Sequence, residues 1–193
     1  MRIADFSPDA ATALKAGLDT FLSGIGGKRL LDQGLDVKSL RACGVLAEAR
    51  LDLKSLPRFL TVGVGDRDAF FSFLRVCLFA GDQSIGSATM ARTSDGGYTL
   101  EHVSLYRSTF VLDGLAAVEK LPGSAEVEVR LLEVTPVYLK ALVLLRDGSI
   151  ESFLVLAPPS VTSGETVAPE AFRKLATALK REHRKAYKLI PGA

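Results

Sequence analysis

This sequence predicts an α+β fold with a large, mainly antiparallel sheet, and three observations support that class. Apolar residues recur at helical spacing near the start of the chain, residues 44–157 contain short apolar runs separated by turn signals, and residues 168–190 form a second helical pattern. Strands gathered in one stretch with helices at both ends are typical of α+β proteins. We expect one α+β domain over residues 1–193, because no linker divides the chain.

The composition fits a folded domain. The chain has 193 residues, of which 48% are hydrophobic and 24% are charged, and its formal net charge is +2. Such a chain carries enough apolar side chains to form a core, which excludes a disordered or collagen-like protein.

The first part of the chain predicts a helical hairpin over residues 7–42. Ser7-Pro8-Asp9 is a strong helix start, because it offers a hydroxyl N-cap, a proline at the first helical position and a carboxylate near the helix N-terminus. The glycine-rich segment 24–27 ends this helix. A second helix is expected over residues 28–42, with Gly34 as a point of interruption.

Residues 44–157 predict the sheet. Apolar and polar residues alternate from Val45 to Lys54, which indicates a strand with one face in water. Pro57 interrupts the pattern, and a further apolar run follows it. Asp147-Gly148 lies between two apolar runs, the strongest short hairpin signal. The apolar runs after Pro57 cover residues 59–64, 70–80, 84–92, 98–106, 127–131, 137–145 and 149–156, and residues 108–121 suit a short helix.

Residues 168–190 predict an amphipathic helix with segregated charge. At about 100° per residue, all seven basic residues between 173 and 188 fall within an arc of roughly 140°. Glu182 is the one acid in this window, so its formal charge is +6 against +2 for the whole chain. The candidate partner-binding residues are Arg173, Lys174, Lys180, Arg181, Arg184, Lys185 and Lys188.

This cationic ridge favours an anionic partner, such as an acidic protein face, anionic lipid head groups or nucleic-acid phosphates. Sequence-specific recognition of nucleic acid is poorly supported, because Tyr187 is the one candidate stacking platform beside these cations. The structural alternative is a helix that docks its apolar side on the sheet and leaves the lysines and arginines in water.

Three motifs that resemble catalytic or phosphate-binding signatures do not meet the requirements of those signatures. Gly27-Lys28 lacks the first glycine of a phosphate loop and the hydroxyl that would follow its lysine. Asp66-Arg67-Asp68 could offer two carboxylates to a hard cation, but acids of a helix-capping loop explain the same residues. Ser84 lacks the first glycine of a nucleophile elbow, since Asp82 stands there. No catalytic residue, metal site or cofactor is predicted.

The histidines and cysteines are expected to be structural. His102 and His183 are predicted to be packed and hydrogen-bonded, and Cys43 and Cys77 to be reduced, buried thiols among apolar neighbours. No apolar stretch approaches the ~18 residues of a membrane span, and the first residues lack a signal-peptide pattern. Cytoplasmic residence is therefore expected.

These observations favour a non-enzymatic interaction or adaptor module that contacts an anionic partner through the terminal basic helix. The alternative is a binding protein or enzyme for an apolar small molecule held between the curved sheet and the helices. Candidate lining residues for that cavity are Phe59, Phe70, Phe71, Phe73, Phe79 and Phe110. A homo-oligomer is a third hypothesis, because strands 70–80 and 137–145 have the composition of strands buried on both faces.

Overall fold

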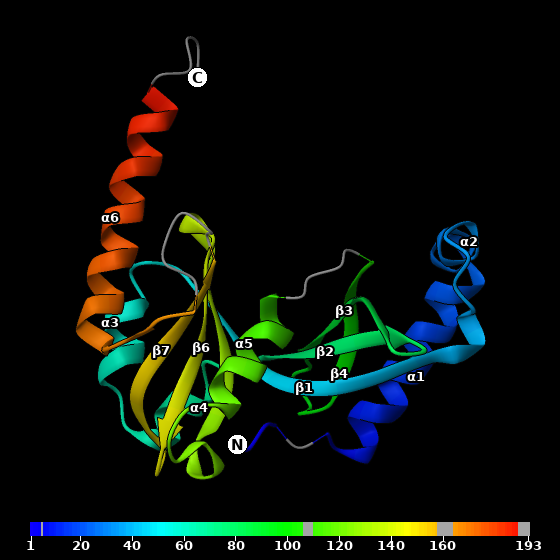
Figure 1. Ribbon diagram of the computed structural model, residues 1–193, viewed down its shortest axis with the longest axis horizontal. Helices are drawn as coiled ribbons and strands as arrows, with labels where there is room; N and C mark the ends of the chain where they lie inside the picture. The colour runs from blue at the N-terminus through cyan, green and yellow to red at the C-terminus, as the bar shows by residue number, and fades with distance from the viewer. Residues whose placement is uncertain (5, 106–109, 158–163, 189–193) are drawn as a thin grey trace. The chain divides into compact units, whose positions relative to one another are not determined.

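The computed structural model describes residues 1–4, 6–105, 110–157 and 164–188; at residues 37, 136 and 183–188 it describes the backbone alone. These residues form an α+β fold (Figure 1). The helices of the described part are α1 (Pro8–Ser23), α2 (Ile25–Asp32), α3 (Leu56–Thr61), α4 (Val64–Asp68), α5 (Phe110–Glu119) and α6 (Pro169–Lys188). Its strands are β1 (Leu40–Leu51), β2 (Phe73–Ala80), β3 (Gln83–Arg92), β4 (Tyr98–Ser104), β5 (Glu128–Val134), β6 (Leu139–Arg146), β7 (Ser149–Ala157) and β8 (Thr166–Val167).

The strands form one hydrogen-bonded order, β4-β3-β2-β1-β5-β6-β7-β8. The pairs β2–β3, β3–β4, β5–β6, β6–β7 and β7–β8 are antiparallel. β1 runs parallel to β5, with Glu48 opposite Leu131. The predicted α+β class with a large, mainly antiparallel sheet is confirmed, and the parallel contact was not expected.

The chain forms two compact units. The N-terminal unit consists of Ile3–Ala47 and Ser72–Thr109, and the C-terminal unit of Met1–Arg2, Glu48–Phe71 and Phe110–Ala193. β1 belongs to both, because its residues up to Ala47 lie in the first unit and those from Glu48 in the second. That residues 1–193 behave as one domain stays a prediction.

In the N-terminal unit, α1 packs on one face of the sheet. Its start follows the predicted signal, since the Ala10 amide donates to the Ser7 hydroxyl at 3.2 Å. Leu14 and Leu18 on α1 are buried against alternate residues of the strands, such as Val76 and Met90. The two-residue alternation of each strand therefore sends one set of side chains into this core.

The predicted hairpin over residues 7–42 is right in its first part and wrong in its second. α2 ends at Asp32, a 3-10 helix covers Val37–Ser39, and β1 begins at Leu40. The expected interruption at Gly34 ends the helix: Gly34 has φ +72°, and the Leu35 amide donates back to the Leu30 carbonyl at 3.0 Å. This is the Schellman type of helix termination, which leaves the following residues free to form a strand.

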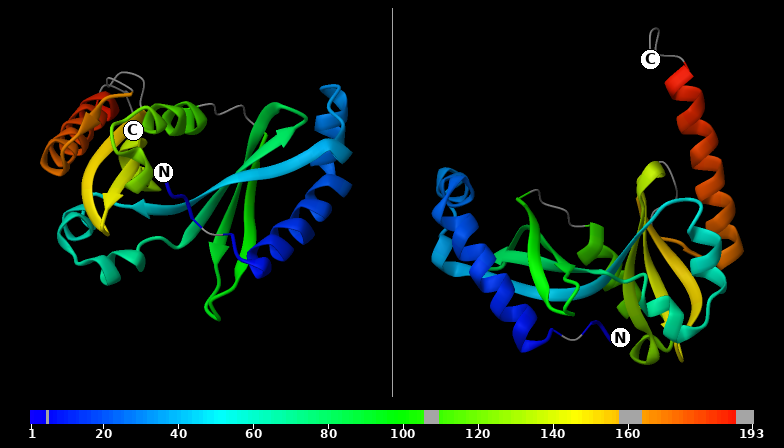
Figure 2. Two further views of the ribbon diagram at one scale, coloured as in Figure 1. Left: turned by 60° about the horizontal axis from the view of Figure 1, so that its bottom comes forward. Right: turned by 180° about the vertical axis from the view of Figure 1, so that it is seen from behind.

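In the C-terminal unit, β6 and β7 lie between two helices. Gly114 of α5 packs closely against Leu142 and Leu156, whereas Phe172 of α6 stacks on Phe153 with ring centroids 4.2 Å apart. Alternate residues of a strand face opposite sides of the sheet, so α5 and α6 cover opposite faces (Figure 2). The strand expected at 137–145 is β6, Leu139–Arg146, preceded by a 3-10 helix at Thr135–Val137, and it is buried on both faces by helices of its own chain.

The β6–β7 hairpin has the predicted turn. Asp147 and Gly148 have φ values of +49° and +74°, and Arg146 pairs with Ser149 across the turn. Positive φ at both central residues defines the type I′ turn, whose twist matches that of the flanking strands.

The predicted sheet over residues 44–157 is interrupted by helices. Residues 108–121 contain the expected helix, α5. The apolar run at 59–64 belongs to α3 and the start of α4, because Pro57 occupies the first turn of α3 and the Asp52 carboxylate binds the Ser55 amide at 2.7 Å just before it. The end of the predicted strand at 98–106 lies outside the described residues, and β8 was not expected.

The predicted wet face of β1 is also wrong in part. Glu48, which the alternation placed in water, is fully buried, and the Arg50 guanidinium donates to its carboxylate at 3.0 Å. β1 lies in the interior of the strand order, and this ion pair compensates the charge that its burial would otherwise leave.

Gly27→Ala is expected to lower the free energy of unfolding by about 1–3 kcal/mol. A Cβ at Gly27 would lie 1.9 Å from the Leu22 carbonyl oxygen, a backbone atom that no side-chain rotation can move. The matched control is Gly65→Ala in α4, where nothing lies within 4 Å and a stabilisation of up to about 1 kcal/mol is expected. Urea unfolding followed by circular dichroism measures both, and equal destabilisation by the two variants would contradict this account.

Candidate functional site

α6 is anchored by its apolar side. Phe172, Ala176 and Leu179 are buried, and the helix contacts β7 and α3. The predicted helix over residues 168–190 is present as Pro169–Lys188, and residues 189–193 lie outside the described part. Its N-terminal half rests on the C-terminal unit, while its later turns extend past the strands (Figure 1).

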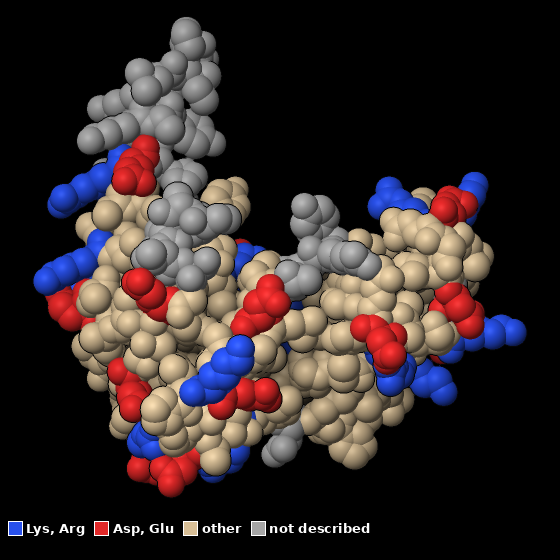
Figure 3. Space-filling model, in the orientation of Figure 1, with Lys and Arg blue, Asp and Glu red and all other residues tan. Residues whose placement is uncertain are grey.

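The opposite side of α6 carries the basic residues. Arg173, Lys174 and Arg181 are exposed, and Lys180 is half-buried. Blue side chains project from the outer edge of α6 in Figure 3, with red ones beside them. Arg184, Lys185 and Lys188 lie on the same helix, but their side chains are outside the described part.

A shallow hollow runs along this basic side. It has a volume of about 390 Å³, and its walls come from α6 alone: Glu170, Arg173, Lys174, Thr177, Ala178 and Arg181. These positions recur every three or four residues and form one stripe of the helix. The short side chains of Thr177 and Ala178 lie between Arg173 and Lys174 at one end and Arg181 at the other, so a partner backbone can approach between cations.

One of the four described cations is compensated within the chain. The Arg173 guanidinium donates to both carboxylate oxygens of Glu170, at 3.1 and 2.9 Å. These hydrogen bonds lower the pKa of Glu170 and raise that of Arg173. Within the described part of the chain, Lys174, Lys180 and Arg181 form no ion pair, although the charge of Lys174 also helps to lower the pKa of Glu170. The outward side therefore keeps a net positive charge.

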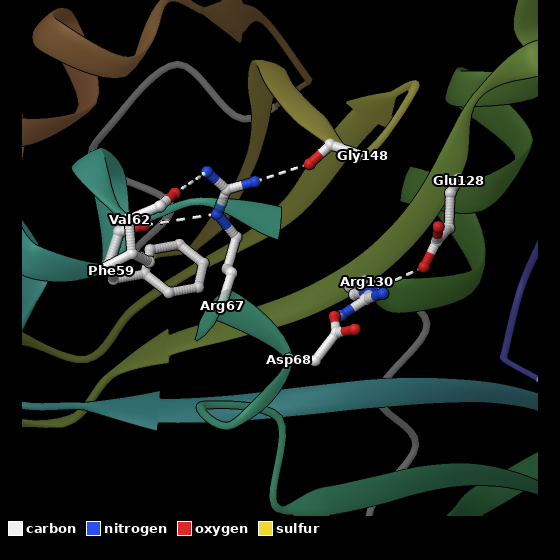
Figure 4. A network of polar contacts seen from close by, with 7 residues as sticks. All are labelled: Phe59, Val62, Arg67, Asp68, Glu128, Arg130 and Gly148. Carbon is white, nitrogen blue, oxygen red and sulfur yellow. Dashed lines mark hydrogen bonds and ion pairs between the residues drawn. The ribbon is translucent and has the colours of Figure 1, made fainter. Parts of the chain in front are cut away.

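A second polar cluster surrounds Arg67, which is only 6% exposed. Its guanidinium donates to three backbone carbonyl oxygens, at 3.4 Å from Phe59, 2.6 Å from Val62 and 2.7 Å from Gly148 (Figure 4). Burial lowers the pKa of Arg67, and the nearby charge of Arg130 adds to this effect. The cluster joins the end of α3 to the β6–β7 turn, which is a structural role.

The Asp68 carboxylate forms an ion pair with Arg130. The Arg130 guanidinium lies 2.5 Å from the Asp68 carboxylate and 2.6 Å from the Glu128 carboxylate (Figure 4). It also lies over the Phe71 ring, 4.6 Å from the ring centroid. Asp66 lies in the first turn of α4. Asp68 thus takes part in an ion pair, and does not act as a helix cap or as a ligand of a metal cation. The described residues contain no group of three or more His, Cys, Asp or Glu that could hold a metal ion.

The two cysteines differ. Cys77 is buried as predicted, but Cys43 is exposed, so the expectation of two buried thiols is wrong for Cys43. Cys43 lies in the first part of β1, where the side chains from Arg41 to Cys43 face water. Burial raises the pKa of the Cys77 thiol from 9.0 to about 11, and the neighbouring Cys43 also raises it.

His102 also departs from the prediction of a packed histidine. It is exposed on β4, the outermost strand of the order, and its side chain makes no hydrogen bond with the described residues. It lines an open polar hollow of about 600 Å³ with Arg29 and Asp32 of α2 and with Gln33, the residue that follows this helix. The side chain of His183 lies outside the described part.

The phenylalanines proposed to line a cavity pack in part against one another. Phe59 meets Phe70 and Phe71 edge to face, with centroids 5.6 and 5.8 Å apart. Phe110 borders a surface hollow beside β7. No observation on these residues favours the small-molecule alternative over a filled core.

Comparisons with known proteins found no matching family model, no matching curated protein and no matching solved structure. Among the described helices, none is long and apolar enough to cross a membrane.

Arg67→Met is expected to lower the free energy of unfolding by roughly 2–4 kcal/mol, because it leaves three carbonyl oxygens without their donor. Arg58→Met is the control, since Arg58 is exposed and its guanidinium lies 6.0 Å from the Phe70 ring. That variant is expected to change stability by less than about 1 kcal/mol. Urea unfolding compares the two, and similar losses would show that the Arg67 hydrogen bonds contribute little.

The Cys77 thiol predicts a fall in stability at alkaline pH. The native chain keeps the proton up to a pKa of about 11, whereas the unfolded chain releases it near 9.0. Between these values the native state binds more protons, so the free energy of unfolding falls by about 1.4 kcal/mol per pH unit from this group. Cys77→Ala should remove that part of the slope, whereas Cys43→Ala should leave most of it, because burial is the larger cause of the raised Cys77 pKa. Identical slopes in the wild type and Cys77→Ala between pH 9 and 11 would refute the assignment.

Proposed function

We propose that this protein is a non-enzymatic interaction module in which α6 binds an acidic protein segment through its outward basic side. The observation that carries this proposal is the positive charge of Lys174, Lys180 and Arg181, which form no ion pair with the described residues, on a helix anchored by its other side. A helix of 20 residues is about 30 Å long. It therefore offers carboxylates a line of cations without first having to fold.

An acidic protein fits these residues better than a membrane does. An amphipathic helix binds a bilayer by burying its apolar side among the lipids. The apolar residues Phe172, Ala176 and Leu179 already pack on the protein itself. Lipid head groups could then be held by charge alone, which gives weak binding.

The hollow also favours a polypeptide over nucleic acid. Thr177 and Ala178 leave room for a peptide backbone between the cations, so that carboxylates on either side could reach Lys174 and Arg181. Among the described side chains, no aromatic one lines this hollow to stack a base. We place the protein in the cytoplasm as part of the same proposal, which the two free thiols support.

The test uses Lys174→Glu/Arg181→Glu and poly-glutamate as the acidic probe. Wild-type protein should bind fluorescent poly-glutamate, with an affinity that falls steeply as salt is raised. The double variant should weaken binding at low salt at least about tenfold, because two attractions become repulsions. Fluorescence anisotropy gives both affinities.

The control is Lys54→Glu/Lys120→Glu, which makes the same charge change at two exposed lysines outside α6. It should retain most of the binding. An equal loss in the control, or no binding of poly-glutamate by the wild type, would overturn the proposal. Tighter binding to phosphatidylserine vesicles or to duplex DNA than to poly-glutamate would overturn the choice of an acidic protein.

A further inference from the structure

We propose that two copies of this chain associate through the first part of β1, with the strands of the two copies running antiparallel. This inference concerns the N-terminal unit and does not rest on the proposed function of α6. It follows from an open strand edge, an apolar groove beside that edge, and rim charges that complement themselves in a second copy.

The open edge is the stretch Leu40–Ala47. β1 is the neighbour of β2 in the strand order, and β5 pairs with β1 on the other side from Glu48 to Leu51. Among the described residues, no backbone group of a turn, loop or cap forms a hydrogen bond with Leu40–Ala47. Backbone groups on such an edge can pair with another strand.

This edge lacks the usual protection against pairing. Natural proteins place charges, prolines or bulges on exposed edges. Arg41 is the only charged residue in the stretch, and its guanidinium is turned to the β2–β3 turn, where it lies 3.0 Å from Asp82 and also contacts the Gly81 carbonyl. Ala42 and Cys43 are exposed and uncharged. Gly44, with φ +66°, interrupts the regular strand, so the pairing segment is Leu40–Cys43.

The apolar groove lies between this edge and α1. Its volume is about 330 Å³. The apolar lining residues are Phe6, Ala11, Leu14, Leu18, Leu22, Leu40 and Ala42. Phe6, Leu22 and Leu40 are only partly buried by their own chain, so a strand added at the edge would cover apolar surface as well as pair its backbone.

The rim of the groove indicates a second copy as the occupant. Lys15 and Asp19 lie one helical turn apart on α1, both exposed, and neither makes an ion pair with the described residues. In a dimer with a two-fold axis, the same surface of each copy contacts the other copy in the opposite direction. Lys15 of one copy can then face Asp19 of the other. A partner that was uniformly acidic or basic would be repelled by one of the two charges.

The first experiment is a charge swap measured by sedimentation over a range of concentrations. The wild type should form a dimer, and Lys15→Asp and Asp19→Lys should each raise the dimer dissociation constant about tenfold. The double variant Lys15→Asp/Asp19→Lys restores opposite charges and should return it to within about threefold of the wild type. A wild type that stays monomeric, or a double variant as weak as the single ones, would overturn the proposal.

The second experiment tests the strand edge itself. Cys43→Lys places two ammonium groups near the axis and should abolish the dimer, while Cys43→Ser, which keeps the size of the side chain, should retain it. A spin label on exposed Cys43 should give an inter-label distance of only a few strand spacings of ~4.8 Å plus the label arms. A dimer with distant labels, or one that survives Cys43→Lys, would place the interface elsewhere and refute this one. Neither result would change the outcome expected for poly-glutamate binding, because the altered residues lie outside α6.

Discussion

Phe172 stacks on Phe153 with ring planes inclined by 12°, and Ala176 and Leu179 are buried on the same side of α6. This contact fixes which side of α6 faces outward, because a helix has one orientation once its apolar stripe is buried. The basic residues on the opposite side are exposed as a consequence. The proposed function thus depends on hydrophobic packing, and the charges determine only which partner is attracted.

The charges of α6 act in water, where individual pairs are weak. An exposed ion pair such as Glu170–Arg173 contributes about 0–1 kcal/mol, and salt reduces it further. The charge of a single exposed lysine is therefore too weak to select a partner. Several cations held on one rigid helix avoid much of the ordering entropy that a flexible basic tail would lose on binding. That difference is why anchorage of the helix matters more to the proposal than its total charge.

The sequence predicted what depends on neighbouring residues and missed what depends on distant ones. The Asp147-Gly148 turn and the capped start of α1 follow from local conformational preferences, and both are present. The parallel pairing of β1 with β5 joins segments about 80 residues apart, and no local pattern encodes it. The pattern around Arg67 predicts only a loop with helix-capping acids. The structural role of Arg67 depends on the Gly148 carbonyl, 81 positions away in the sequence, which folding brings to its guanidinium.

The amphipathic side of α6 was predictable because helical periodicity is local, whereas the Glu170–Arg173 pairing depends on side-chain conformation.

β1 shows how one strand can meet opposite requirements along its length. From Glu48 onward it has neighbours on both sides, and the carboxylate buried there is compensated by Arg50. Before Gly44 it has a neighbour on one side only, and its exposed residues are small and uncharged except for Arg41. If this edge of β1 stayed unpaired in the working protein, a lysine or proline at position 42 or 43 would prevent unwanted strand pairing without affecting the core. The charge of Arg41 could have prevented such pairing, but its guanidinium binds the β2–β3 turn of its own sheet. The residues of this edge thus suit a strand that is paired in the working protein.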